Sequence, residues 1–243
     1  MVSEKIFKHA WYTEGAGQVI AQAEKAELDE ILPTLYGYHL VQVGEPGLAS
    51  FVNSSLISHR VLIHPAGPSV WPCSYIKGAL ASLPILSNSV DVVVLAHTLE
   101  EVPDPHQLLR EAHRVLIPEG HLVITGFNPI SFWGAWHYFK QKLGKIPRQG
   151  KMLSLNRVCD WLKLLDFQIV GGSRFGYMLP FKQYHSQAKQ QWFEQKGRKY
   201  LPFLGGAYSV VGVKRVVSLT PIKPKWLDEE AWVKEVEGVP GSR

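Results

Sequence analysis

The sequence predicts an α/β fold, with a doubly wound and mostly parallel sheet. Short runs of β-branched residues alternate along the chain with stretches of helical spacing, which is the order of elements that such sheets need. The runs are apolar at nearly every position, as expected of parallel strands that helices cover on both faces. The 243 residues are enough for one sizeable core and short for two full domains.

The clearest unit is a β-α-β segment in the middle of the chain. Its strands are predicted at Val92–Leu95 and Leu122–Thr125. Between them, Asp104 suits a helix N-cap and Pro105 suits the first turn. Pro118–Gly120 is expected to end this helix. The helix has one apolar stripe, made of Leu108, Leu109, Ala112, Val115 and Leu116.

Upstream of this unit, the pattern predicts one helix and two strands. Residues 17–35 place apolar side chains among Glu and Lys, which indicates a helix packed on the edge of the sheet. Leu40–Val43 reads as a strand that runs into the turn Gly44–Gly47, and Val61–Ile63 reads as a strand closed by His64.

Downstream, the pattern predicts one helix and two closing strands. Ser154 can cap a helix, and Phe167–Val170 and Ser209–Val213 read as strands. The apolar positions of the helix have i, i+3, i+4, i+7 spacing and are Val158, Trp161, Leu162 and Leu165.

The chain divides into three predicted parts. Residues 1–38 form an N-terminal helical segment, 39–216 form the α/β domain, and 217–243 form a loosely attached tail. Two aromatic and basic insertions, 129–153 and 176–207, interrupt the domain. Insertions at strand ends commonly shape the substrate side of such a sheet.

Composition and charge exclude several classes of protein. Apolar residues make up 46% and charged residues 19%, which excludes a disordered chain. The apolar runs are too short to span a bilayer, and we expect a cytoplasmic protein. Cys73 and Cys159 lie far apart, so neither a disulfide framework nor a zinc site is expected. His106 and His113 have poor metal spacing, and we predict no metal site.

The modest net charge of +5 is a cancellation between parts of the chain. Residues 1–131 hold 7 basic and 13 acidic side chains, residues 132–215 hold 15 and 3, and the remainder holds 4 and 5. The positive charge is therefore concentrated in the part that carries the two insertions, where an anionic acceptor or partner is expected to dock.

The run SNSVDVVVLAHTLEEVPDPHQLLREAHRVLIPEGHLVITGF, within residues 84–127, resembles class I S-adenosylmethionine-dependent methyltransferases of the methyltransferase type 11, UbiE-like kind. GYHLVQVGEPG and ITGFNPISFWG are also similar to an uncharacterised bacterial YafS-like subgroup. The resemblance implies a Rossmann-like sheet of seven strands, S-adenosylmethionine as cofactor, and direct methyl transfer to a small-molecule acceptor.

The resemblance places the cofactor at four segments: Gly44, Glu45, Pro46 and Gly47; His64; Ala79, Leu80 and Ala81; and Ala96 with His97. Three of the family's acidic anchors are replaced. Gln42 stands where an acid precedes the first glycine, His64 stands where an acid binds the ribose, and Ala79 stands where an acid lies near the adenine. Pro46 also replaces a glycine of the turn. Nicotinamide binding is disfavoured, because neither GxGxxG nor the following acid is present.

Three residues are candidates for catalysis. His97 follows the strand whose end faces the methyl group in the family, and an ordinary imidazole pKa suits a general base; the alternative is a histidine that holds the loop. Glu100 shares this loop and is either catalytic or a solvated charge. Asn128 follows the next strand, where it orients the acceptor or caps a helix that starts at Pro129.

Three functions remain open. The first is a methyltransferase for an anionic or hydrophobic small molecule. The second is a non-catalytic methyltransferase-like module with weakened cofactor binding, which serves as an interaction or regulatory protein. The third is an RNA-directed methyltransferase, which the basic and aromatic second half suggests.

Overall fold

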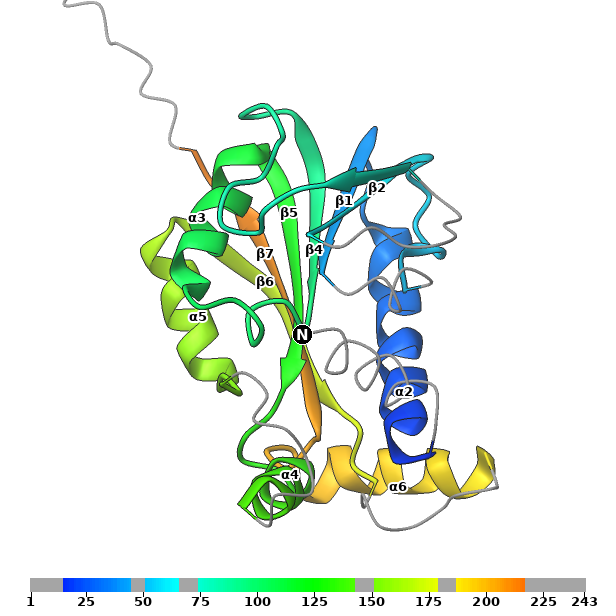
Figure 1. Cartoon of the computed structure of the whole chain (residues 1–243). Helices are drawn as coiled ribbons and strands as arrows, with labels where there is room; N and C mark the ends of the chain where they lie inside the picture. The colour runs from blue at the N-terminus through cyan, green and yellow to red at the C-terminus, as the bar shows by residue number, and fades with distance from the viewer. Residues whose placement is uncertain (1–14, 45–50, 66–73, 143–150, 179–186, 217–243) are drawn as a thin grey trace, which may run out of the picture.

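The computed structural model describes residues 15–44, 51–65, 74–142, 151–178 and 187–216 (Figure 1). They form a seven-stranded sheet of order β3-β2-β1-β4-β5-β7-β6. Among these strands, β7 runs antiparallel to its two neighbours, whereas the other pairs are parallel. The predicted doubly wound, mostly parallel fold is thus confirmed. The strands are β1 (His39–Gly44), β2 (His59–His64), β3 (Ser74–Lys77), β4 (Val90–Ala96), β5 (Leu116–Phe127), β6 (Phe167–Phe175) and β7 (Ala207–Lys214).

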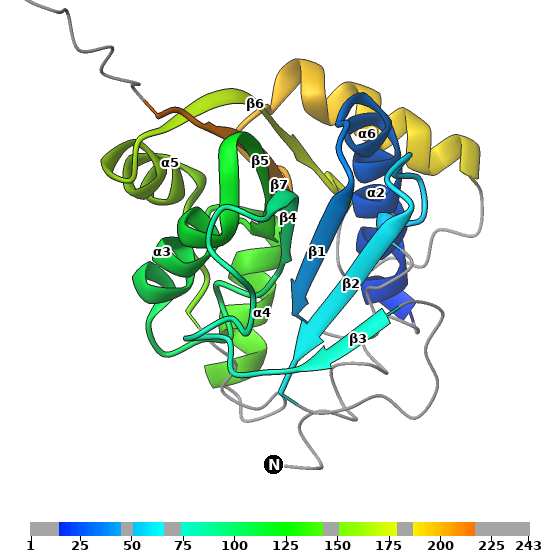
Figure 2. The same cartoon turned by 90° about the horizontal axis from the view of Figure 1, so that it is seen from above.

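Helices lie on both faces of the sheet and beyond one end of it. Seen from above, α2 and α6 lie on one side and α3 and α5 on the other (Figure 2). Below the carboxyl ends of the strands lie α4 and α6 (Figure 1). The helices are α2 (Gly15–Ile31), followed by the 3-10 turn η1 (Leu32–Thr34), then α3 (Pro105–Val115), α4 (Phe132–Lys142), α5 (Leu155–Leu164) and α6 (Gln187–Tyr200).

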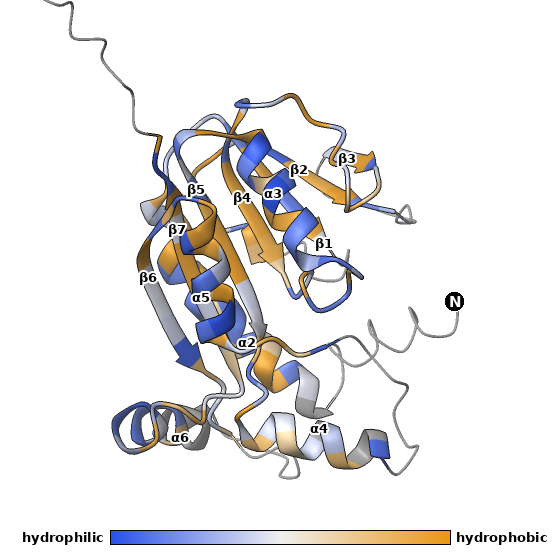
Figure 3. Cartoon of the chain, turned by 90° about the vertical axis from the view of Figure 1, so that its left-hand side faces the viewer, coloured by the Kyte–Doolittle hydropathy of each residue, from blue (hydrophilic) through white to orange (hydrophobic). Residues whose placement is uncertain are grey.

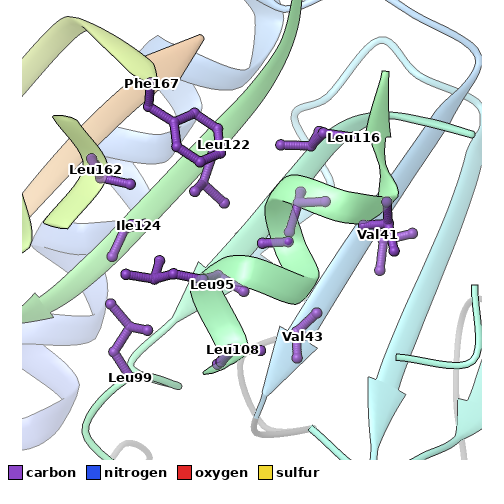
Figure 4. Packing of buried hydrophobic residues seen from close by; sticks show 14 of the residues in the cluster. Val41, Val43, Leu95, Leu99, Leu108, Leu116, Leu122, Ile124, Leu162 and Phe167 are labelled. Atoms are coloured by element: carbon purple, nitrogen blue, oxygen red, sulfur yellow. The ribbon is translucent and has the colours of Figure 1, made fainter. Parts of the chain in front are cut away.

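Two apolar layers fill the space between sheet and helices. Under α3 and α5 the largest cluster joins side chains such as Leu95, Leu108 and Leu162 (Figure 4). Under α2 a second cluster includes Leu28 and Val94. Colouring by hydropathy shows strands that are mainly apolar beneath helices with polar outer faces (Figure 3). Burial on both sides explains why the central strands are apolar throughout.

The β-α-β unit forms as the sequence predicts at its start and differs at its end. Asp104 caps α3, with its carboxylate accepting a hydrogen bond of 3.1 Å from the Gln107 N–H. Pro118–Gly120 does not form a separate turn, because β5 begins at Leu116 directly after α3. The turn-forming residues are instead taken up within the strand, where the pairing of β4 and β5 shifts register.

Two other local predictions fare differently. Ser154 occupies the N-cap position of α5, as predicted, but its side chain makes no capping hydrogen bond. The predicted insertions 129–153 and 176–207 contain α4 and α6.

The predicted tail, residues 217–243, lies outside the described residues. Within the part of the chain that the structure describes, no helix is long and apolar enough to cross a membrane.

Candidate functional site at the carboxyl edge of the sheet

The order of the strands reverses between β1 and β4, which makes their carboxyl ends the topological switch point. Ligands of open α/β sheets bind at this place. Gly44 and Ala96 are paired there, and Ala96 is paired in turn with Thr125 on β5. Two of the smallest residues thus end the two central strands.

Gly44 has a backbone conformation that other residues rarely adopt, with φ at 127°. A Cβ atom at this position would lie 2.5 Å from Thr98 Oγ1. The Thr98 hydroxyl donates a hydrogen bond of 2.6 Å to the Val43 carbonyl, so the loop after β4 is fastened to the end of β1. The glycine that the sequence places in the cofactor turn is therefore required by the local geometry.

His97 turns away from the sheet edge and is buried against α2. Its backbone is left-handed, with φ at 53°, and its side chain is almost fully buried. Nε2 lies 2.9 Å from Glu24 Oε2, and Nδ1 lies 3.6 Å from Glu100 Oε2. The ring also packs against Phe127, at 4.1 Å between centroids. The imidazole thus lies between two carboxylates.

The charge state of His97 follows from these neighbours. Burial by itself would lower the pKa of the imidazole, but Glu24 and Glu100 outweigh that effect and raise the pKa to about 10. The ring is therefore protonated at neutral pH. Its Nε2–H donates to Glu24, and its charge also attracts the Glu100 carboxylate at 3.6 Å. In this state it has no lone pair to accept a proton, and these contacts argue against the general-base role.

Glu100 is held in place but keeps some contact with solvent. Its Oε1 accepts a hydrogen bond of 2.5 Å from the Phe127 N–H at the end of β5. The side chain is 12% exposed, in contrast to the 4% of His97 and 0% of Glu24. Among these three ionisable groups, Glu100 is the one that an acceptor molecule can approach.

A row of small and polar residues crosses the sheet beneath α2. The pairing places Gly44, Ala96, Thr125, Ser209 and Ser173 side by side on five neighbouring strands. Thr125 Oγ1 is buried without a hydrogen-bond partner among the described residues. This polar row continues the candidate site beneath α2.

Glu24 and Glu27 of α2 face this row and were not predicted from the sequence. Glu27 accepts hydrogen bonds from Ser173 and Ser209, and it pairs with Arg198 at 3.0 Å. The sequence did hold a signal: both carboxylates fall on the apolar stripe of their helix, at four and seven residues after Ile20. Charged residues on a buried stripe need partners, which these contacts supply.

Asn128 fastens the first insertion to the loop after α6. Its Nδ2 donates at 2.9 Å to the carbonyls of Phe203 and Gly205, and its Oδ1 accepts from the Ile130 N–H at 3.0 Å. The predicted helix start at Pro129 is wrong, since α4 begins at residue 132. The cap is Ser131, whose Oγ accepts from the Gly134 N–H at 3.0 Å.

The remaining predicted cofactor residues lie at the ends of β2 and β3. His64 ends β2, is buried, and is paired with Lys77 at the end of β3. Ala79 and Ala81 are exposed on the loop that follows, and Leu80 between them packs against the larger core cluster. Glu45, Pro46 and Gly47 fall outside the described residues.

Comparison with known proteins identifies the family. A model described as "Methyltransferase domain" matches residues 55–124. The uncharacterized protein YafS of Escherichia coli is 35% identical over 204 residues, which cover 84% of this chain and 80% of that protein. The chain belongs to the YafS family of methyltransferase-domain proteins. The similarity to YafS thus extends well beyond the residues that the domain model matches.

Other relatives agree with this assignment over shorter stretches or in fold. The UbiE C-methyltransferase of ubiquinone and menaquinone biosynthesis from Ruegeria is 31% identical over 81 residues, 33% of this chain and 32% of that protein. A S-adenosylmethionine-dependent methyltransferase from Thermotoga maritima, titled as a possible histamine N-methyltransferase, superposes with a TM-score of 0.63 at 16% identity. It covers 85% of this chain and 93% of that one. A S-adenosylmethionine-dependent methyltransferase from Archaeoglobus fulgidus gives 0.61 at 16%, over 86% and 98%. These structures share the fold.

Part of this edge fits the cofactor that the family implies. The turn at Gly44 and the backbone of the loop around Leu80 offer a close approach and an apolar contact to an adenosine. At the position where the family resemblance places the ribose, His64 offers an imidazole ring instead of a carboxylate, and residues 46–90 contain no Asp or Glu. An imidazole can exchange a hydrogen bond with one hydroxyl, whereas a carboxylate accepts from two. The described residues of this edge therefore fit S-adenosylmethionine only through contacts other than the family's carboxylates.

Proposed function

We propose that this YafS-family protein is a S-adenosylmethionine-dependent methyltransferase that acts on an anionic or hydrophobic small molecule. The observation that carries the proposal is the switch point between β1 and β4, where Gly44 and Ala96 are paired and Gly44 has a φ of 127°. The missing side chain at Gly44 lets Thr98 pack against the end of β1, and the switch point that this shapes is the place where ligands of open α/β sheets bind. The cofactor, when bound, supplies an activated methyl group.

The chain's own residues then position the reactants. Thr98 fixes the turn at Gly44 through its bond to Val43. His97 acts as a positioning residue, because as a cation it ties Glu24 of α2 to Glu100 in the loop after β4. Glu100 is the group we assign to accept a proton or a hydrogen bond from the acceptor, since it retains exposure at this edge.

Asn128 is a second positioning residue rather than a group that touches the acceptor. Its amide nitrogen donates to the carbonyls of Phe203 and Gly205, and these hydrogen bonds join the two insertions beside the site. Together the insertions carry 10 basic side chains and one acidic side chain. This excess favours a negatively charged acceptor over a cationic one.

The test is transfer of a tritiated methyl group from S-adenosylmethionine to fractions of a bacterial extract. We expect label in the fraction of small molecules, and we expect Glu100→Gln to lower the rate about 10²-fold or more while the protein stays folded. Label in the RNA fraction would support the RNA-directed alternative and contradict this proposal. No transfer to any fraction would favour the non-catalytic module, whose motivation is the absence of the acidic anchors.

A further inference from the structure

Beyond the candidate site, the two insertions form an exposed surface at the same end of the molecule. Both α4 and α6 lie past the carboxyl ends of the strands in two perpendicular views (Figures 1 and 3). Eight large apolar side chains there are between 45% and 68% exposed. They are Ile130, Phe132, Tyr138, Phe139, Trp192, Tyr200, Leu201 and Phe203. Together with Lys196 and Lys199 of α6, we call these residues the aromatic-lysine surface.

One stripe of α6 is fixed to the body of the protein. Glu194 accepts hydrogen bonds of 2.8 and 3.0 Å from the N–H groups of Gly176 and Tyr177. Gly197 lies so close to the Tyr177 ring that a Cβ would be 2.3 Å from its Cγ. Arg198 pairs with Glu27 of α2. The orientation of α6 is therefore set by the fold.

The opposite stripe of α6 faces solvent and has an unusual composition. Trp192, Lys196, Lys199 and Tyr200 follow one another at helical spacing, and all four are exposed. Both ammonium groups lie over the Tyr200 ring, at 5.5 and 5.7 Å from its centroid. Trp, Tyr and Lys are the residues that anchor proteins at the boundary between headgroups and acyl chains.

The charge of the insertions matches an anionic surface. Across residues 129–153 and 176–207 there are 10 Lys and Arg against a single acid, Glu194. That acid is bonded to two backbone N–H groups and offsets a single charge, so the insertions keep an excess of nine positive charges. A bilayer with anionic lipids attracts such a segment, with about 1 kcal/mol for each Lys or Arg near its surface.

We propose that the aromatic-lysine surface docks the protein on an anionic lipid bilayer, with α6 lying in the plane of the interface. Exposed aliphatic side chains such as Ile130 and Leu201 gain from burial among acyl chains, whereas they offer no ring on which RNA bases stack. An arginine guanidinium is the group best suited to bind an RNA phosphate through two hydrogen bonds. On α6 that group is Arg198, and it already pairs with Glu27. These features favour a bilayer over RNA.

Docking in this way turns the candidate site toward the membrane, because α4 and α6 lie at the carboxyl end of the sheet (Figure 1). This inference goes beyond the proposed function and does not depend on it. It requires neither cofactor nor methyl transfer, and it can be tested on the protein without either.

The test is co-sedimentation of the full chain with vesicles of phosphatidylcholine alone and with about one third phosphatidylglycerol, a composition that supplies the anionic surface. We expect binding to the anionic vesicles that weakens as salt is added. Lys196→Gln together with Lys199→Gln should weaken it roughly 30-fold, because each lysine near the surface contributes about a factor of five.

Two controls make the result specific. Arg157→Gln with Lys163→Gln removes the same charge from exposed positions on α5, across the sheet from α2 (Figure 2), and should change binding less than about threefold. Trp192→Phe should remove a blue shift of tryptophan fluorescence on vesicle addition. Equal binding to both kinds of vesicle, equal effects of the two double variants, or binding to an RNA oligonucleotide but not to vesicles would overturn the proposal.

Discussion

His64→Asp should strengthen the binding of S-adenosylmethionine. His64 ends β2 at the position where the family has an acid that binds the ribose, and its neighbour across the strands is Lys77. An aspartate there can accept hydrogen bonds from two hydroxyls, and the lysine favours its charge. The substitution therefore restores an anchor that this chain has lost.

The size of the effect follows from two opposing terms. A hydrogen bond to a charged group contributes about 1.5–3 kcal/mol, which corresponds to roughly 10- to 100-fold in affinity. His64 is 5% exposed, so a carboxylate at this position is partly desolvated before the ligand arrives. We therefore expect the lower end of the range, about tenfold tighter binding, and a free protein that melts a few degrees lower, at about 2–4 °C for each kcal/mol lost.

Calorimetric titration at pH 8, where the aspartate is ionised, measures this change. The control is His59→Asp, at the exposed opposite end of the same strand, which should leave affinity unchanged. If His64→Asp is folded and binds no more tightly than the unsubstituted protein, the ribose does not lie at the end of β2 and the reasoning is refuted.

Three further predictions concern stability. The folded pKa of His97, about 10, exceeds its unfolded value of about 6.5, so its stabilising effect is complete below pH 6.5 and is lost as pH rises through 10. The difference in melting temperature between the unsubstituted protein and His97→Asn should therefore become smaller from pH 7 to pH 10.5. A difference that stays constant over this range would contradict the assignment of His97 as a buried cation. Gly44→Ala should lower the melting temperature by at least about 3 °C, because strain costs about 1–3 kcal/mol and Thr98 obstructs the Cβ; an unchanged melt would show that the turn is relaxed. Lys214→Met should cost about 2–4 kcal/mol in urea unfolding, because it leaves three oxygens, now bonded at 2.7–2.8 Å, without their donor; a loss under about 0.5 kcal/mol would indicate that water replaces the ammonium.

Sequence was sufficient where structure depends on neighbours along the chain. The central strands are apolar over their whole length, and Asp104 caps α3 through a residue three positions away. Both patterns are local, so they predict the β-α-β unit without knowledge of the fold. The turn signal at Pro118–Gly120 was misread because a bulged strand accommodates the same residues that end a helix.

The candidate site was less predictable because its decisive contacts join distant segments. His97 and Glu24 are 73 positions apart, and their contact converts an expected base into a buried cation. Asn128 was correctly placed at the edge, but the carbonyls that accept hydrogen bonds from its amide belong to a loop more than 70 residues later. Pairings of this kind follow from how α2 and the insertions pack, which no spacing rule specifies.

We expect the edge at Gly44 to bind S-adenosylmethionine despite its missing acids. The most direct test is calorimetric titration of the purified full chain with S-adenosylmethionine and with S-adenosylhomocysteine, its demethylated product. We predict saturable binding of both ligands at one site per chain, which Gly44→Asp abolishes in a protein that remains folded. An absence of binding at millimolar cofactor, or an affinity that Gly44→Asp leaves unchanged, would contradict the account.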